Sequence, residues 1–209
     1  MHPISHWVDK IQENLLRYQK VVEQYRTIAI WCNQIEKVFA IKPNLLDFPH
    51  GIGLKKIPFL KNWPTKKIIT LINNGKLTEK FTSFQKWNIH TNRSLFNQIK
   101  AKLLVWDYYL SFLEGNYCET WIIEEVLYTK NLYFFRGLLW KNENYTMIVG
   151  LNKFQGTKKF ANDYCSFYTA LLTSKEISDT AKKIDKISKI DRIWYNYQNK
   201  DIDQYSKLS

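Results

Sequence analysis

The chain has 209 residues, of which 45% are hydrophobic and 16% aromatic, enough to bury one sizeable core but not two independent ones. Lys and Arg (31) outnumber Asp and Glu (19), and the net charge of +12 favours polyanions or small acidic ligands. No apolar run approaches the roughly 20 residues of a membrane helix, and the first residues lack a secretory pattern, so we expect a cytoplasmic or organelle-interior protein.

The basic excess is nearly all lysine, and nucleotide bias in a genome would produce the same composition, so charge alone does not assign a function. The three cysteines, Cys32, Cys118 and Cys165, are odd in number and widely spaced. This argues against a disulfide framework, and without a CxxC or HxxxH pair no zinc site is expected.

Residues 1–40 are predicted to form one long amphipathic helix. Apolar residues recur at alternating spacings of three and four, as on one helix face: Val8, Ile11, Leu15, Tyr18, Val22, Tyr25, Ala29 and Cys32. Such a helix packs on its own domain or pairs with a second copy in an oligomer.

Residues 41–65 contain six of the chain's Pro and Gly residues within a short span and predict a connecting loop. Phe48, Phe59 and Trp63 within it indicate a loop that packs against the rest of the protein. Residues 66–209 then form the predicted α+β domain.

This domain is expected to begin with a short helix around Ile68–Ile72 that stops at Gly75. Residues 94–114 fit both a helix and a strand, and their length favours the helix. Three β-rich runs within 118–152, separated by turn-forming residues, predict an antiparallel meander.

Residues 158–173 and the first part of 175–197 are predicted to be helical, because apolar residues recur along one face of each. The second helix would align Lys182, Lys186, Lys189 and Arg192. Such a stripe is either a solvated face or a track for nucleic-acid phosphates.

Few side chains suggest catalysis, because no metal cluster, phosphate loop or nucleophile motif occurs, and His50 and His90 have no Ser or Cys motif beside them. Arg136 is the strongest candidate, since it lies among apolar residues of an expected central strand. A buried arginine requires a carboxylate. That carboxylate belongs either to Glu124 or Glu125, in a structural pair, or to a small acidic ligand.

Four segments of the chain, in order, resemble the chorismate pyruvate-lyase family. They are IITLINNGKLTEKF, which is similar to an early helix–turn; WIIEEVLY, similar to a Trp-Leu-Arg-Glu strand; LYFFRGLLW, similar to the strand with a second arginine; and LNKFQGTKKF, similar to a Leu-x-Lys-Leu-Gly segment. The resemblance covers residues 66–175 and implies an α+β fold with helices packed on an antiparallel sheet.

The resemblance also implies a binding site for a small aromatic carboxylic acid that includes Arg136, Glu124 and Leu77. It implies elimination of pyruvate from chorismate, without a metal or other cofactor. Ile123 stands where the family has its first arginine, so the sequence leaves open whether the chain binds such an acid with or without turnover. The alternative is a non-enzymatic nucleic-acid-binding or assembly protein.

Overall fold

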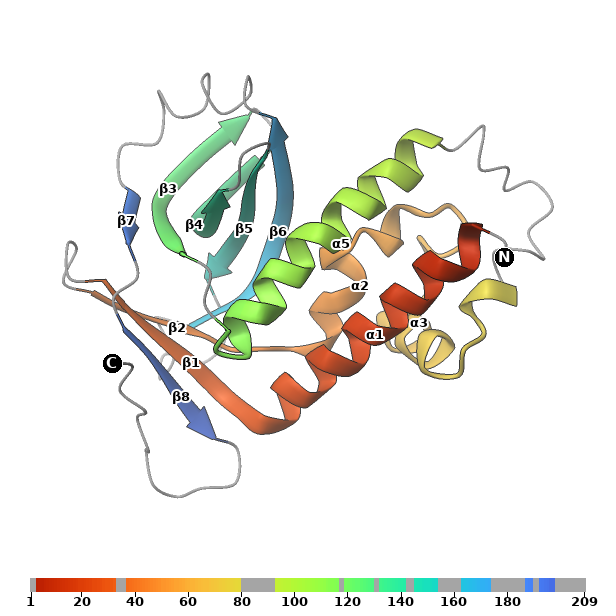
Figure 1. The fold of residues 1–209 in the computed structure, drawn as a ribbon, viewed down its shortest axis with the longest axis horizontal. Coiled ribbons are helices and arrows are strands. Elements are labelled where there is room, and N and C mark those ends of the chain that lie inside the picture. Colours follow the sequence, from red (N-terminus) through yellow and green to blue (C-terminus); the bar gives the residue numbers. More distant parts are fainter. Residues whose placement is uncertain are drawn as a thin grey trace.

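The protein consists of a helical layer packed against a curled β-sheet (Figure 1). The computed structural model describes the backbone of residues 3–32, 37–79, 93–116, 119–129, 132–141, 145–153, 163–173, 187–189 and 192–197. Side chains are described for 6–30, 41–79, 94–116, 119–122, 137–140 and 147–150. The α+β class, the meander and the long N-terminal helix are confirmed.

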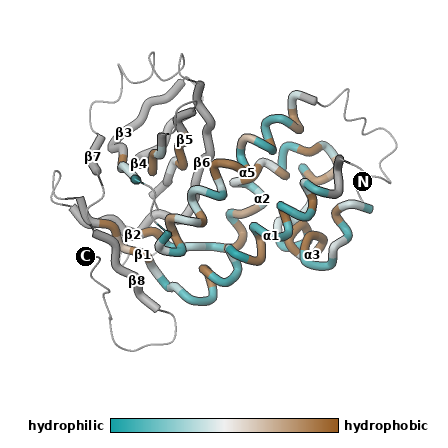
Figure 2. The backbone as a smooth tube through the Cα atoms, viewed as in Figure 1, coloured by the Kyte–Doolittle hydropathy of each residue, from teal (hydrophilic) through white to brown (hydrophobic). Residues whose placement is uncertain are grey.

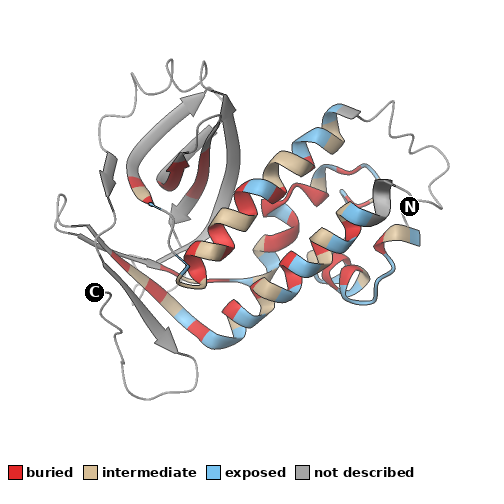
Figure 3. Ribbon diagram, viewed as in Figure 1, coloured by how far each residue is buried: buried red, intermediate tan, exposed pale blue. Residues whose placement is uncertain are grey.

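The helical layer, within the described residues, is built from three longer helices and three short ones. These are α1 (Pro3–Gln24), η2 (Leu45–Asp47), α2 (Phe48–Gly51), η3 (Leu54–Lys56), α3 (Thr65–Asn73) and α5 (Arg93–Leu113). Hydrophobic and hydrophilic positions alternate along α1 and α5 (Figure 2), and buried positions recur along both helices and make up most of α2 (Figure 3). None of the described helices combines the length and apolar content needed to cross a lipid bilayer.

The sheet has eight described strands in the order β7-β3-β4-β5-β6-β2-β1-β8. Their bounds are β1 (Tyr25–Cys32), β2 (Lys37–Ile41), β3 (Trp121–Thr129), β4 (Leu132–Lys141), β5 (Tyr145–Lys153), β6 (Asp163–Thr173), β7 (Ile187–Lys189) and β8 (Arg192–Tyr197). All of these pairs are antiparallel except β2 with β6, which is parallel. Strands β3, β4 and β5 form the predicted meander.

The two ends of the strand order come from neighbouring parts of the chain. Strand β7 pairs with β3 at one edge, and β8 pairs with β1 at the other, yet only residues 190 and 191 separate β7 from β8. Three Cα–Cα steps span at most about 11 Å, so the two edges approach each other closely here. The sheet is therefore curled, as the curvature of its strands in Figure 1 also shows.

The helix predicted for residues 1–40 is wrong beyond Gln24, where the chain enters β1 and then β2. The three-and-four spacing of apolar residues continues past Tyr25 to Ala29 and Cys32, but it does not describe the burial pattern of this segment. In β1 the buried side chains of Ile28 and Ile30 instead follow the two-residue period of a strand. The β-branched and aromatic residues of this segment favour that outcome.

The helix predicted for residues 158–173 is also wrong: the described part, residues 163–173, is strand β6. This strand pairs with β5 from Tyr145↔Thr173 to Lys153↔Tyr164. Long-range pairing with β5 and β2 outweighs the local helical pattern. In the predicted helix of 175–197, residues 187–189 and 192–197 are strands, and residues 175–186 lie outside the described part of the chain.

Residues 41–65, predicted as a packed connecting loop, form an irregular segment with short helical turns. Phe48 is fully buried, while Phe59 and Trp63 are partly buried against the core. The short helix at Ile68–Ile72 lies within α3, and Gly75, at φ 67°, closes its end by donating a backbone hydrogen bond to Ile72.

The centre of the helical layer is an aromatic cluster around Trp106 of α5. Its fully buried indole lies edge-on to Tyr18 of α1 (ring centroids 5.2 Å apart), to Phe48 of α2 (5.2 Å) and to Tyr109 (5.5 Å). Tyr18 also stacks on Phe48 and accepts a hydrogen bond from the backbone N–H of Asn44 (3.1 Å). One residue thus connects three helices that are distant in sequence.

Candidate functional site

The side of the sheet that faces α5 is a continuous buried surface, here called the core face. It comprises Thr120, which directly precedes β3, Ile122 of β3, Leu138 and Trp140 of β4, and Met147 and Val149 of β5. Trp140 packs against Tyr108 and Phe112 of α5, at centroid distances of 6.4 and 6.1 Å. Its indole N–H donates a buried hydrogen bond to Thr120 Oγ1 (2.8 Å), which satisfies the one polar group of the ring.

Arg136 and Glu124 occupy the next row of this pattern. In the backbone register, Arg136 of β4 lies opposite Glu124 of β3 and opposite Leu151 of β5. Because side chains alternate along a strand, positions 136, 138 and 140 have the same parity. The register therefore brings two of the three predicted ligand-binding residues to adjacent positions, in line with the core face. Their side chains lie outside the described set.

Leu77, the third predicted ligand-binding residue, is fully buried in the core cluster and follows α3 in the helical layer. The structure therefore places it on a different layer from Arg136 and Glu124. It has no polar side-chain atom, so its contribution to any site would be shape and apolar contact.

The two described members of the predicted lysine stripe do not lie on one helix. Lys189 lies in β7, opposite Trp121, and Arg192 lies in β8, opposite Trp31. These strands are at different edges of the sheet, so the two residues do not share a helix face. Lys182 and Lys186, like His90, lie outside the described residues.

An open groove of about 970 Å³ runs between the N-terminal half of α1 and α5. Trp7 lines it, packing edge-on against Phe96 with the Lys100 ammonium 4.5 Å from its ring centroid. The groove also contains Lys10 and Asp107, which pair with each other at 2.8 Å. Among the described residues, no group of three or more His, Cys, Asp or Glu side chains could hold a metal ion, in this groove or elsewhere.

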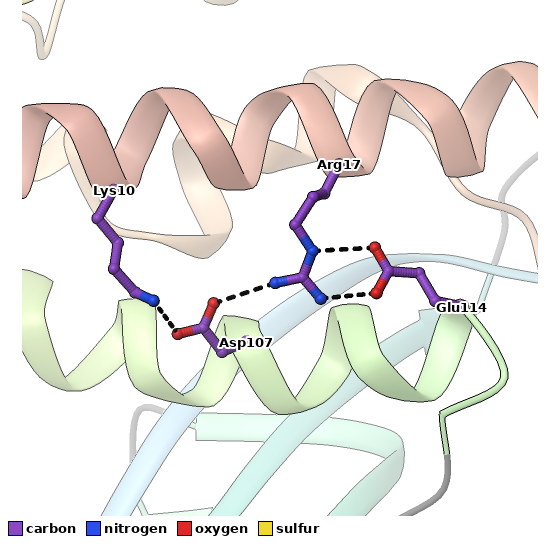
Figure 4. Close-up of polar contacts among 4 residues, drawn as sticks. All are labelled: Lys10, Arg17, Asp107 and Glu114. Atoms are coloured by element: carbon purple, nitrogen blue, oxygen red, sulfur yellow. Dashed lines mark hydrogen bonds and ion pairs between the residues drawn. The ribbon is translucent and has the colours of Figure 1, made fainter.

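A set of ion pairs, here called the ion-pair ladder, links α1 to α5 and the residue that follows it (Figure 4). It consists of Lys10, Arg17, Asp107 and Glu114. Arg17 donates to both carboxylate oxygens of Glu114, from Nε at 3.0 Å and from Nη2 at 2.6 Å. Its Nη1 lies 3.5 Å from Oδ1 of Asp107, whose other carboxylate oxygen forms the ion pair with Lys10. The bond to Glu114 raises the pKa of Arg17, so the guanidinium stays charged. From Lys10–Asp107 to Arg17–Glu114 both chain segments advance by seven residues, so α1 runs parallel to α5, which Glu114 directly follows.

We expect Arg17→Ala and Glu114→Ala each to destabilise the fold, with a coupling energy of about 1 kcal/mol in a double-mutant cycle. The bidentate geometry places this pair at the upper end of the range for partly exposed pairs. Urea denaturation of the single and double variants measures the coupling, which should shrink in 1 M salt. Lys20→Ala, at an exposed position of α1, is the control; a coupling near zero would contradict a structural role for the ladder.

Asn14 lies on α1 between Lys10 and Arg17, and its side chain is fully buried. Neither its amide nitrogen nor its oxygen has a hydrogen-bond partner among the described residues. We expect Asn14→Leu, which keeps the branching and removes the polar atoms, to raise the free energy of unfolding by about 1–2 kcal/mol. Thermal and urea denaturation test this, with Asn97→Leu at an exposed position of α5 as the control; a loss of stability would show that the amide is satisfied in solution.

A second cluster of charged residues was not identified from the sequence. His50 of α2, Lys55 and Lys56 of η3 and Lys102 of α5 form this basic cluster. No sequence motif marks this cluster, but the surrounding stretch has a large excess of basic over acidic residues. Residues 48–106 contain eleven Lys and Arg residues and one acidic residue, Glu79. That stretch carries ten of the twelve net positive charges of the chain.

Comparison of the chain with protein-family models, with curated proteins and with solved structures finds no match. The site must therefore be interpreted from its own residues, of which two groups stand out. These are the Arg136–Glu124 row of the sheet and the basic cluster of the helical layer.

Proposed function

We propose that the chain binds a small aromatic carboxylic acid in line with the core face of the meander, with Arg136 as the clamp for the ligand carboxylate. The observation that carries this proposal is the register of Arg136 with Glu124, one row beyond Leu138 and Ile122. Both of those apolar residues are fully buried. In the backbone register, an arginine and a glutamate thus occupy the positions that follow two residues of the core.

The energetics of burial explain why this row suits an acidic ligand. A guanidinium beside apolar side chains is destabilising unless an anion accepts its hydrogen bonds. Glu124 is the nearest such anion in the register and would hold Arg136 in the unliganded protein. A ligand carboxylate can accept two parallel N–H bonds from the same guanidinium, while the neighbouring apolar row accommodates an aromatic ring.

The reaction implied by the resemblance to chorismate pyruvate-lyases is the elimination of pyruvate from chorismate. In it the ether C–O bond breaks, a ring proton is lost, and 4-hydroxybenzoate and pyruvate leave. Catalysis by such a site would rest on positioning and on charge stabilisation rather than on a nucleophile. Ile123 stands where the family has its first arginine. We therefore propose binding of the acid as the function and treat turnover as a separate question.

Calorimetric titration of the full chain with chorismate and with 4-hydroxybenzoate tests the proposal. We expect binding of at least one of them and a loss of affinity of about 30-fold or more in Arg136→Gln, since removing a charged partner costs about 2–5 kcal/mol. Arg136→Lys should retain part of the affinity. Arg26→Gln, at an exposed position of β1, is the matched control.

Two outcomes would contradict the proposal: no heat with either acid, or equal affinities in wild type, Arg136→Gln and Arg26→Gln. Pyruvate release from chorismate, followed in parallel, separates binding from turnover.

The alternative of nucleic-acid binding through Lys182, Lys186, Lys189 and Arg192 stays a prediction. Lys189 and Arg192 lie in strands, so the helical face expected to align these four residues does not support it. Oligomer formation through the N-terminal helix also stays a prediction.

A further inference from the structure

Three lysines occupy the surface of the helical layer around the start of α3. Lys61, Lys66 and Lys67, here called the lysine patch, are all exposed. Four apolar residues interspersed with them are buried in the core: Ile57, Leu60, Ile68 and Ile69. The segment therefore packs through its apolar residues and presents its lysines to solvent.

Trp63 lies in the middle of this segment and fixes the lysines around it. The Lys67 ammonium lies 4.2 Å from the centroid of the Trp63 ring, and the Lys55 ammonium donates to the backbone carbonyl of Trp63. The backbone N–H of Lys61 donates to the carbonyl of Ile57, so the chain turns just before Trp63. Contacts and a turn of the backbone thus gather these lysines, in addition to their closeness in sequence.

The lysine patch has no carboxylate partner among the described residues, since none of its three lysines forms an ion pair there. On average one residue in eleven of the chain is acidic, yet residues 48–78 and 80–92 contain none. Helix α3 has no acidic residue in its first turn, and Glu79 follows the helix, whereas the lysine patch lies at its start. The positive charge of the patch is therefore available to an anion from outside the protein.

The exposed composition of this segment favours a nucleic acid over a lipid membrane. A basic surface that inserts into a membrane carries large exposed apolar side chains beside its charges. Among the described residues, the exposed large apolar side chains lie outside this segment: Leu16, Leu46 and Leu104. Separate, solvent-exposed ammonium groups also suit the repeated phosphates of a polymer better than a single small anion, which needs donors converging in a pocket.

We infer that the lysine patch binds the phosphate backbone of a nucleic acid. Each ammonium group that neutralises a phosphate releases a condensed counterion, which makes binding favourable at low salt and independent of base sequence. Lys67 is already positioned over Trp63, so less side-chain entropy is lost when a phosphate binds. The patch is separate from residues 182–192 and shares no residue with the proposed aromatic-acid site. Helix α3 lies at the end of the helical layer away from the sheet (Figure 1).

Fluorescence anisotropy of a labelled single strand of about 20 nucleotides, as DNA and as RNA, titrated with the full chain at several salt concentrations, tests this inference. We expect Lys66→Gln/Lys67→Gln to weaken binding at least tenfold at low salt. The slope of log affinity against log salt concentration should become shallower by about 1–2, because two phosphate contacts are lost.

The matched control is Lys20→Gln/Arg26→Gln, which removes the same charge at exposed positions of α1 and β1. This control should leave the affinity within about threefold of wild type, since its residues lie outside the patch. Equal losses in the two double variants would overturn the inference, because binding would then follow the net charge alone. Absence of binding to either strand at low salt would overturn it as well.

A second readout uses the wild-type protein and does not depend on any variant. An amine-acetylating reagent, followed by mass spectrometry, should modify Lys61 and Lys66 several-fold more slowly when the strand is bound, with Lys20 unaffected. Equal rates at Lys61 and Lys66 with and without the strand would contradict the assigned surface. Binding to phosphatidylcholine vesicles that contain phosphatidylserine, without binding to either strand, would contradict the assigned class of partner.

Discussion

Trp106→Ala is expected to lower the free energy of unfolding by about 3–5 kcal/mol, the largest effect of any single substitution considered. The indole is fully buried and contacts Tyr18, Phe48 and Tyr109 through edge-on ring pairs. Truncation removes the transfer free energy of the ring, leaves a cavity, and loses aromatic contacts worth about 0.5–1.5 kcal/mol each. Urea denaturation followed by far-UV circular dichroism measures the change.

Trp106→Phe, which keeps an aromatic ring, gives a smaller loss and remains measurable if the alanine variant does not fold. Trp7→Ala, at a partly exposed tryptophan that lines the α1–α5 groove, is the control and should cost much less. If Trp106→Ala were no more destabilising than Trp7→Ala, the aromatic cluster would not be the centre of the helical layer.

The second large effect is a pH dependence of stability caused by Asp47. Burial raises the pKa of this carboxyl to about 7, and its Oδ2 has no hydrogen-bond partner among the described residues. The unfolded chain releases the same proton near pH 4. Between about pH 4 and pH 7 the folded state therefore holds a proton that the unfolded state has lost, and stability falls as pH rises through that window.

Asp47→Asn should remove this contribution and stabilise the protein at pH 8 by about 2–4 kcal/mol relative to its effect at pH 4. Urea denaturation at a series of pH values measures the difference between wild type and variant. Asp9→Asn, at an exposed position of α1, controls for the loss of one negative charge and should change stability by no more than about 0.5 kcal/mol. Parallel pH profiles for wild type and Asp47→Asn would contradict the argument.

The parts of the fold that the sequence predicts are those whose local pattern agrees with their long-range contacts. Helix α5 combines a helical stripe with a length too great for a single strand, and the meander combines β-rich runs with turn-forming residues. Gly75 ends α3 through a backbone conformation that its residue type makes accessible. In each case the chain needs no distant partner to favour the structure.

The errors occur where distant partners decide. Residues 163–173 can present a helical stripe, but β5 and β2 on either side pair with them as a strand. Residues 25–41 become β1 and β2 because β8 and β6, more than 120 residues away in sequence, complete their hydrogen bonding. Neither partner is visible in a local window of sequence.

The candidate sites divide in the same way. Arg136 is recognisable from the sequence because one charged residue interrupts an apolar strand, and its alignment with Glu124 follows from a single hairpin. The basic cluster is not recognisable locally, since His50 and Lys102 come together only when α5 packs over Gly53. Its one sequence signal is the scarcity of acidic residues between positions 48 and 106.

The most direct test of the proposed function is a crystal structure of the full chain with 4-hydroxybenzoate. We expect the ligand carboxylate within hydrogen-bond distance of the Arg136 guanidinium, and the ligand ring against the row formed by Ile122 and Leu138. A structure in which Arg136 extends into bulk solvent, or in which the acid occupies only the α1–α5 groove or the basic cluster, would contradict the proposal.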